Sequence, residues 1–183
     1  MYSNILKHFY WDGLLTDCEQ FVDHCEVCSS RRTSSLQPAA GASLSEPPFP
    51  FHTVHIDHKT LSKSGDYSYV LVCTDRLTRF TMAVPQKTLS AEDTLQALMS
   101  IFTIFGMPMR MYSDNGSAFR NELLSAFQKY AGLRHIYVLP NSPQGNGPAE
   151  QGVRRIAELL HKHTRQHRDW HLTLGAITFA LNS

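Results

Sequence analysis

Downstream of residue 50, apolar residues recur first at every second position and later at every third or fourth. Residues 52–59 alternate between apolar and polar, residues 69–73 form an unbroken apolar run, and residues 80–85 alternate again. These patterns predict three strands. Because the connections between them are short, we expect an antiparallel meander.

Helix and strand patterns then follow one another to the end of the sequence. Ser90, with Asp93 three residues later, is typical of a helix N-terminus, and Gly106 with Pro108 would end that helix. Beyond it we expect a strand, a helix, a strand and two helices, over residues 109–113, 121–131, 136–139, 148–167 and 170–181. This order predicts an α/β domain with one mixed sheet.

The first fifty residues have a different character. Residues 1–30 show a helical pattern, and residues 31–50 are rich in serine and proline. Two consecutive prolines fix φ and cannot join a β-ladder, so we expect an extended linker at residues 31–50. The predicted division is therefore a small helical segment, 1–30, a linker, 31–50, and a larger domain, 51–183.

Composition narrows the class of protein. Seventeen Lys and Arg against sixteen Asp and Glu leave a net charge of +1, so contacts with nucleic acid would need local basic patches. No apolar stretch approaches the length of a membrane span, and the first residues lack the layout of a secretory signal. We expect an intracellular protein with no membrane partner. Two of its four cysteines, Cys18 and Cys73, are expected to pack as small buried residues.

Three acidic residues occupy positions where α/β domains gather their functional sites. Asp57 interrupts an apolar strand, Asp114 follows another strand, and Glu150 lies in a first helical turn, with 35 residues between the last two. Carboxylates brought together raise one another's pKa, and a pair of Mg²⁺ ions would relieve that repulsion. Two such ions support in-line phosphoryl displacement.

Each carboxylate also has an ordinary structural explanation. Asp-Asn-Gly at 114–116 is a common turn, and Glu150 would complement the helix dipole. Asp57 is the least usual of the three, because it interrupts an apolar strand. Spacing alone does not decide between the catalytic and the structural explanation.

Two further groups of residues have types that suit binding. Cys25 and Cys28 are spaced as half of a tetrahedral zinc site, which needs two more ligands. The two nearby histidines are interpreted as solvated: His8 and His24. We therefore expect Zn²⁺ only if further ligands lie upstream of this sequence.

The helix that begins near residue 148 carries Arg154, Arg155 and Lys162. A basic run is usually a solvated face, but beside a phosphodiester site it is a candidate DNA track. In the preceding loop, the candidate contacts to a DNA end are Gln144 and Asn146. The alternative for that segment is an ordinary mobile loop.

Ordered motifs cover nearly the whole chain. They are Phe9-Tyr-Trp11, Cys25-x-x-Cys28, Pro50-Phe51-x-x-Val-x-Ile-Asp57, Tyr69-x-Leu-Val-x-x-Asp75-Arg-x-Thr-Arg79-Phe80, Ile104-Phe-Gly-x-Pro108, Ser113-Asp-Asn-Gly116 and Ser142-Pro-Gln-x-Asn-Gly147-x-x-Glu150. With these motifs the chain resembles the retroviral-type integrases of long-terminal-repeat retrotransposons, closest to the gypsy-like branch. The resemblance implies a ribonuclease-H-like core with a five-stranded mixed sheet flanked by helices. It also implies an N-terminal HHCC-type zinc module, of which Cys25 and Cys28 would be half.

The same resemblance implies a function. Asp57, Asp114 and Glu150 would hold Mg²⁺ or Mn²⁺ in a D,D-x(35)-E site that processes the 3′ ends of element DNA and joins them to target DNA. Such an enzyme would work on DNA in the nucleus as a homo-oligomer. A domesticated or inactive descendant that binds DNA or a protein partner is the main alternative. A ribonuclease H or another nuclease on the same fold is a weaker one, because the Cys-x-x-Cys segment would have no role there.

Overall fold

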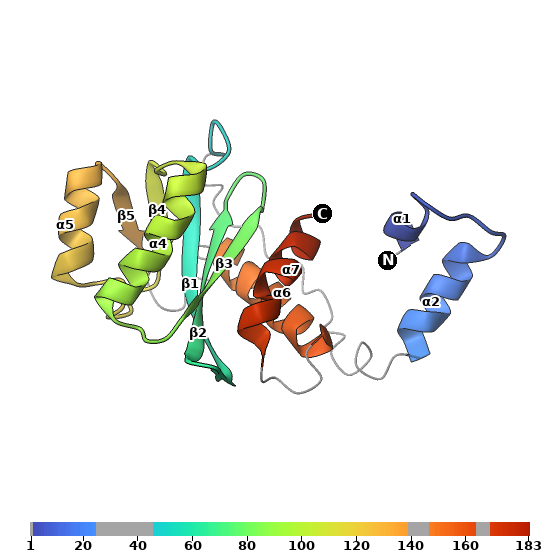
Figure 1. The fold of residues 1–183 in the computed structure, drawn as a ribbon. Helices are drawn as coiled ribbons and strands as arrows, with labels where there is room; N and C mark the ends of the chain where they lie inside the picture. Colours follow the sequence, from blue (N-terminus) through green and yellow to red (C-terminus); the bar gives the residue numbers. More distant parts are fainter. Residues whose placement is uncertain (1, 25–45, 139–146, 164–168) are drawn as a thin grey trace. The chain divides into compact units, whose positions relative to one another are not determined.

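The computed structural model describes residues 2–24, 46–138, 147–163 and 169–183, and Figure 1 shows their ribbon. Contacts divide the chain into two units, Met1–Ala39 and Ala40–Ser183. The finer division at residues 30 and 50 stays a prediction, because most of the expected linker lies outside the described residues.

The first unit is helical where it is described, as the sequence pattern predicts. It contains α1, Tyr2–Ile5, and α2, Leu14–His24. Leu14 and Cys18, one helical turn apart on α2, are buried, so they mark the inner face of this helix. The two histidines expected to be solvated are exposed: His8 and His24.

The second unit is built on a five-stranded mixed sheet with the order β3-β2-β1-β4-β5. Its strands are β1, Thr53–Ser64, β2, Tyr67–Asp75, β3, Thr81–Gln86, β4, Arg110–Ser113, and β5, Arg134–Tyr137. The first three pair antiparallel, whereas β4 pairs parallel with β1 and β5 parallel with β4. The predicted meander and the mixed sheet are confirmed.

Several strand boundaries differ from the sequence prediction, among them those of β1, β2 and β5. β1 continues five residues beyond Lys59 to Ser64, because its hairpin with β2 extends past the core into a mostly exposed ribbon. β5 begins at Arg134, two residues before the apolar run, since it is an edge strand that alternates only weakly in burial. Pro85 lies inside β3, which an edge strand tolerates.

Four helices surround the sheet. They are α4, Ala91–Phe105, α5, Glu122–Ala131, α6, Gly147–His163, and α7, Trp170–Asn182. The expected continuation of α6 to residue 167 lies outside the described residues. In the part of the chain that the structure describes, no helix has both the length and the apolar character needed to cross a membrane.

The helix caps follow the sequence signals with one difference. Ser90 Oγ accepts the amide of Asp93 at 3.1 Å, and Gly132 ends α5 in the left-handed conformation. The Asp93 carboxylate does not return to Ser90, however. It accepts the amide and the hydroxyl of Thr88 at 2.9 and 2.6 Å, because the chain turns sharply before the helix.

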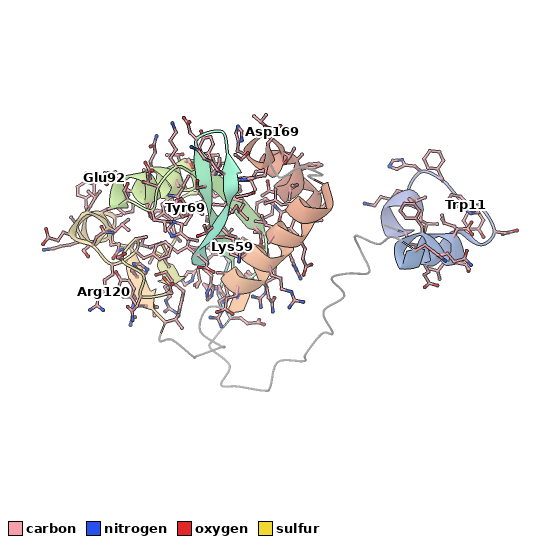
Figure 2. All side chains as sticks on the ribbon, turned by 90° about the horizontal axis from the view of Figure 1, so that it is seen from below. Trp11, Lys59, Tyr69, Glu92, Arg120 and Asp169 are labelled. Atoms are coloured by element: carbon pink, nitrogen blue, oxygen red, sulfur yellow. The ribbon has the colours of Figure 1, made fainter. Side chains whose placement is uncertain are left out.

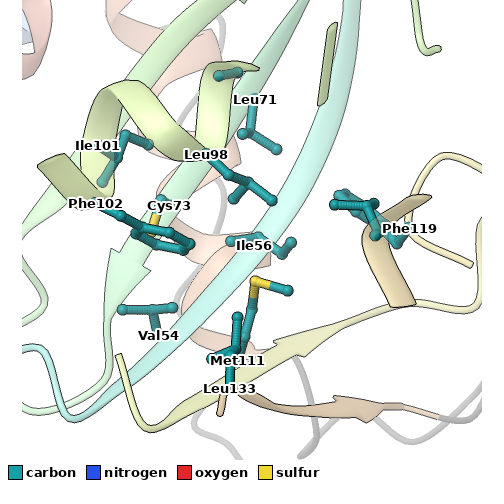
Figure 3. Packing of buried hydrophobic residues seen from close by; sticks show 12 residues of the cluster. Val54, Ile56, Leu71, Cys73, Leu98, Ile101, Phe102, Met111, Phe119 and Leu133 are labelled. Atoms are coloured by element: carbon teal, nitrogen blue, oxygen red, sulfur yellow. The ribbon is translucent and has the colours of Figure 1, made fainter. Parts of the chain in front are cut away.

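The two faces of the sheet bury separate apolar clusters. On one face α4 and α5 cover β1, β2 and β4, and Figure 3 shows the side chains that meet there, among them Ile56, Leu71, Leu98 and Met111. On the other face α6 and α7 cover Val70 and Val72 of β2. Each fully buried side chain of this size contributes about 1.5–3 kcal/mol relative to exposure. Two free cysteines are buried, as predicted: Cys18 and Cys73.

Helix α6 lies unusually close to the sheet at Gly152. A Cβ atom at this position would lie 2.5 Å from Thr74 Oγ1 and 3.3 Å from both Thr81 Cγ2 and Val72 Cγ1. The two threonines are buried and joined through their hydroxyls at 3.2 Å, so they have little freedom to move aside. Only glycine allows the helix to approach β2 and β3 this closely.

We predict that Gly152→Ala lowers the free energy of unfolding by about 1–3 kcal/mol, the usual cost of overpacking a tight contact. The matched control is Gly175→Ala, in the exposed part of α7, where a new Cβ meets nothing within 4 Å. That substitution should be neutral or stabilising by up to about 1 kcal/mol, because alanine favours helix. Urea unfolding followed by circular dichroism measures both, and equal effects would contradict the proposed close contact.

Candidate active site

Asp57 and Asp114 lie at the same level on neighbouring parallel strands. In the register of β1 and β4, Thr53 pairs with Arg110. Asp57 lies four residues after Thr53, and Asp114 lies four residues after Arg110. Asp57 belongs to the central strand β1, whereas Asp114 comes directly after β4. The sheet therefore brings two of the three predicted carboxylates to neighbouring positions.

The turn after β4 fixes the carboxylate of Asp114. Its Oδ1 accepts the amide of Gly116 at 3.0 Å, and the side chain is exposed. A Cβ atom on Gly116 would approach that same oxygen to 3.0 Å. The Asp-Asn-Gly turn is thus present as the structural explanation predicts, and it also fixes the direction of the carboxylate.

Glu150 lies in the first turn of α6, as predicted, and its side chain is exposed. Ala149 on one side of it is buried, and Gly152 packs against β2 two residues later. The helix dipole favours a negative charge at this end. Close packing of the helix thus sets the position of Glu150 relative to the sheet.

The three carboxylates influence one another electrostatically. The pKa of Asp57 is raised to about 6, first by burial and then by the negative charges of Asp114 and Glu150. The amide of His58, which donates to Asp57 Oδ1 at 2.8 Å, and the charge of Lys59 act in the opposite direction. Lys59 is labelled in Figure 2. An acidic centre of this kind favours a bound cation.

These residues fit a hard divalent cation by the chemistry of their donors, since carboxylate oxygens are the ligands that Mg²⁺ and Mn²⁺ prefer. The raised pKa of Asp57 supports the fit. Within residues 2–24, 46–138, 147–163 and 169–183, however, no three His, Cys, Asp or Glu side chains are gathered closely enough to hold a metal ion. The assignment of the three as metal ligands stays a prediction.

The structure describes the side chains of some candidate binding residues and not of others. Arg154 and Arg155 are exposed on α6, and Arg154 Nε contacts Glu158 Oε1 at 3.1 Å. The side chain of Lys162 lies outside the description. So do four other predicted residues: Gln144, Asn146, Cys25 and Cys28.

The structure adds residues near the site that the sequence analysis missed. His58 stacks on Phe119 with ring centroids 4.4 Å apart, and burial lowers its pKa to about 4. Arg120, labelled in Figure 2, lies over the ring of Tyr137 at 5.9 Å, just after the Asp114 turn. Pairing across strands and turns produces these contacts, and spacing along the sequence gives no sign of them.

Family comparison agrees with this arrangement. Residues 47–143 match the profile described as "Integrase core domain", which is more than half of the chain. The chain belongs to the integrase core family. Residues 1–34 of this integrase chain match the profile described as "Integrase zinc binding domain".

Curated relatives of the integrase chain are longer proteins. It is 28% identical over 181 residues to the Pro-Pol polyprotein of feline foamy virus, covering 98% of the chain and 16% of the polyprotein. It is 26% identical over 176 residues to gypsy retrotransposon integrase-like protein 1 of Rattus norvegicus, covering 95% and 34%. The chain thus spans about a sixth and a third of these relatives.

Solved structures share the fold. The integrase catalytic core domain of HTLV-2, in complex with magnesium, aligns with a TM-score of 0.62 at 19% identity, over 73% of this chain and 86% of that one. A chain of the simian T-cell lymphotropic virus intasome in complex with PP2A regulatory subunit B56 gamma aligns with a TM-score of 0.69 at 16% identity, over 98% and 67%. The predicted ribonuclease-H-like fold is confirmed.

We predict that Asp57→Asn stabilises the metal-free protein at neutral pH by on the order of 1 kcal/mol, because it removes a half-buried charge beside two other carboxylates. The folded-state pKa of about 6 exceeds the ordinary aspartate pKa of 3.8, so Asp57 destabilises the fold above pH 6. That cost fades as the pH falls from 6 to 3.8, where the side chain is protonated in both states.

Thermal unfolding of both proteins in chelator, between pH 4 and pH 8, measures the difference. The variant should melt higher at pH 8, and the two curves should converge near pH 4. A constant difference across this range would contradict the raised pKa.

Proposed function

We propose that this chain is the core of a DNA integrase that transfers phosphoryl groups with Asp57, Asp114 and Glu150. The observation that carries the proposal is the register of β1 and β4, which sets Asp57 and Asp114 at the same level, with Glu150 in the first turn of α6. The raised pKa of Asp57, to which burial and the charges of Asp114 and Glu150 contribute, supports it. A protein without need of a cation there would gain stability by replacing one of the three. Membership of the integrase core family supports the same conclusion.

The proposed reaction has two steps at one site. Water first attacks a phosphodiester near the 3′ end of element DNA, and the bond breaks between phosphorus and the 3′ oxygen of the nucleoside on its 5′ side. The freed 3′-hydroxyl then attacks a phosphodiester of target DNA, whose own 3′ oxygen leaves. Two Mg²⁺ or Mn²⁺ ions, when bound, supply activation of the attacking oxygen and stabilisation of the leaving oxygen.

Residues of the sheet and of α6 would supply the carboxylates and the DNA contacts for these two steps. Asp57 on β1 provides a fixed carboxylate at the centre of the sheet, and Asp114 provides a second at the same level. Glu150 provides the third from α6. The exposed guanidinium groups of Arg154 and Arg155 on the same helix would contact DNA phosphates, a kind of contact that gives affinity without sequence preference.

The remaining parts of the proposal concern zinc, contacts with the DNA end, the oligomeric state and the location in the cell. Cys25 and Cys28 would bind Zn²⁺ together with two further ligands, in line with the zinc-binding profile at residues 1–34. The loop residues Gln144 and Asn146, with Lys162, would contact the DNA end. We infer a homo-oligomer from the integrase family and a nuclear site of action from the DNA substrate.

We predict that Glu150→Gln abolishes DNA joining, by at least about a hundredfold, while the fold stays intact, because the amide removes one charge from the cation site. Purified protein is mixed with Mg²⁺ or Mn²⁺ and a duplex with an element-end sequence, and strand transfer into plasmid is measured. Glu122→Gln is the matched control, since Glu122 is also an exposed glutamate in a first helical turn, on α5.

Normal joining by Glu150→Gln would remove Glu150 from the mechanism. DNA binding without joining by the unmodified chain, under conditions that support related integrases, would favour the alternative of a domesticated protein that binds DNA or a partner.

A further inference from the structure

A line of hydrogen bonds runs from helix α5 to the turn that carries Asp114, and the proposed reaction does not use it. Gln128 Nε2 lies 2.7 Å from His135 Nδ1, and His135 Nε2 lies 2.8 Å from Ser113 Oγ. Ser113 Oγ in turn donates to the backbone oxygen of Asp114 at 2.7 Å. Three elements, α5, β5 and β4, thus contribute to one connected line.

The direction of these hydrogen bonds is consistent throughout. The Gln128 amide nitrogen can only donate, so His135 Nδ1 accepts and the ring proton lies on Nε2. That proton goes to Ser113 Oγ, whose own hydrogen goes to Asp114. Each hydrogen bond in this line therefore has one donor and one acceptor, and the arrangement holds His135 in one tautomer.

The surroundings keep this line rigid. Ser113 is fully buried and Gln128 is 9% exposed. The ring of His135 lies against that of Tyr137 with centroids 4.1 Å apart. Burial lowers the pKa of His135 to about 4, so the ring is neutral at physiological pH and Nδ1 stays free to accept.

The Asp114 turn needs such support because the strand ladder ends just before it. The last ladder-type bond here runs from the amide of Val138 to the oxygen of Ser113 at 2.8 Å. Beyond that point the next carbonyl, of Asp114, is bound by the Ser113 side chain, while the Asp114 carboxylate is bound by Gly116. The line from α5 therefore determines how the peptide between Asp114 and Asn115 is oriented.

We propose that His135 is a positioning residue that, through Ser113, orients the Asp114 turn for cation binding. The effect of this residue on catalysis rests on the proposed function, whereas its positioning of the turn does not. Residues of this kind, which hold a metal ligand from behind, commonly change metal affinity by 10- to 100-fold when they are replaced.

The test compares three variants of the full chain. Ser113→Ala removes both bonds of the hydroxyl at a buried position without adding volume. His135→Phe keeps the ring against Tyr137 but loses both nitrogens, whereas His135→Gln keeps an amide donor close to the place of Nε2. Thermal unfolding establishes that each variant is folded.

Two measurements are made on each variant. In metal-free protein, hydrogen exchange of the Gly116 amide, which is bonded to Asp114 Oδ1, should speed up severalfold in Ser113→Ala and His135→Phe and stay near the wild-type rate in His135→Gln. In strand-transfer assays, the Mg²⁺ concentration for half-maximal joining should rise about tenfold in the first two variants and less than about twofold in the third.

Unchanged exchange and an unchanged Mg²⁺ midpoint in Ser113→Ala and His135→Phe would overturn the inference. So would equal defects in His135→Phe and His135→Gln, because the loss would then not depend on the donor. A wild-type chain that joins no DNA would count against the proposed function alone, since the exchange rates of metal-free protein still decide whether His135 positions the turn.

Discussion

Helix α6 reaches the sheet so closely at Gly152 that no side chain fits between them, and the position of Glu150 depends on this contact. The threonine pair beneath, Thr74 and Thr81, is buried and hydrogen-bonded, so it forms a firm surface. Apolar packing of the rest of the helix against Val70 and Val72 holds it there. The packing that stabilises this layer therefore also sets the distance from the Glu150 carboxylate to those of Asp57 and Asp114.

The grouping of carboxylates in the proposed site lowers the stability of the fold as well as suiting the proposed reaction. The charged form of the half-buried Asp57 is disfavoured by burial and by its two negative neighbours, as its raised pKa indicates. Fold stability is supplied elsewhere, by two apolar clusters on opposite faces of the sheet. The separation matters, because a site that costs stability can persist only where the remaining structure supplies a surplus.

Much of this architecture could be predicted from the sequence. Apolar periodicity indicates the strands and helices, and the signals at Ser90 and Gly132 mark helix ends that the structure confirms. Sequence spacing does not predict the start of β5, because an edge strand needs no apolar run. It also does not predict that the Asp93 carboxylate accepts a hydrogen bond from Thr88. The support behind Asp114 could not be predicted either, because the parallel pairing of β4 with β5 brings Ser113 to His135, and Gln128 reaches His135 from helix α5.

The three carboxylates are fixed by three different kinds of force. Asp57 belongs to the central strand β1, where the ladder pairs it with Val72 of β2. Glu150 depends on apolar packing and on the space that a glycine leaves. Asp114 lies beyond the ladder and outside any helix, and side-chain hydrogen bonds hold it there. A polar line can support a carboxylate in a turn, which accounts for the histidine, serine and glutamine behind Asp114, while apolar side chains pack behind Glu150.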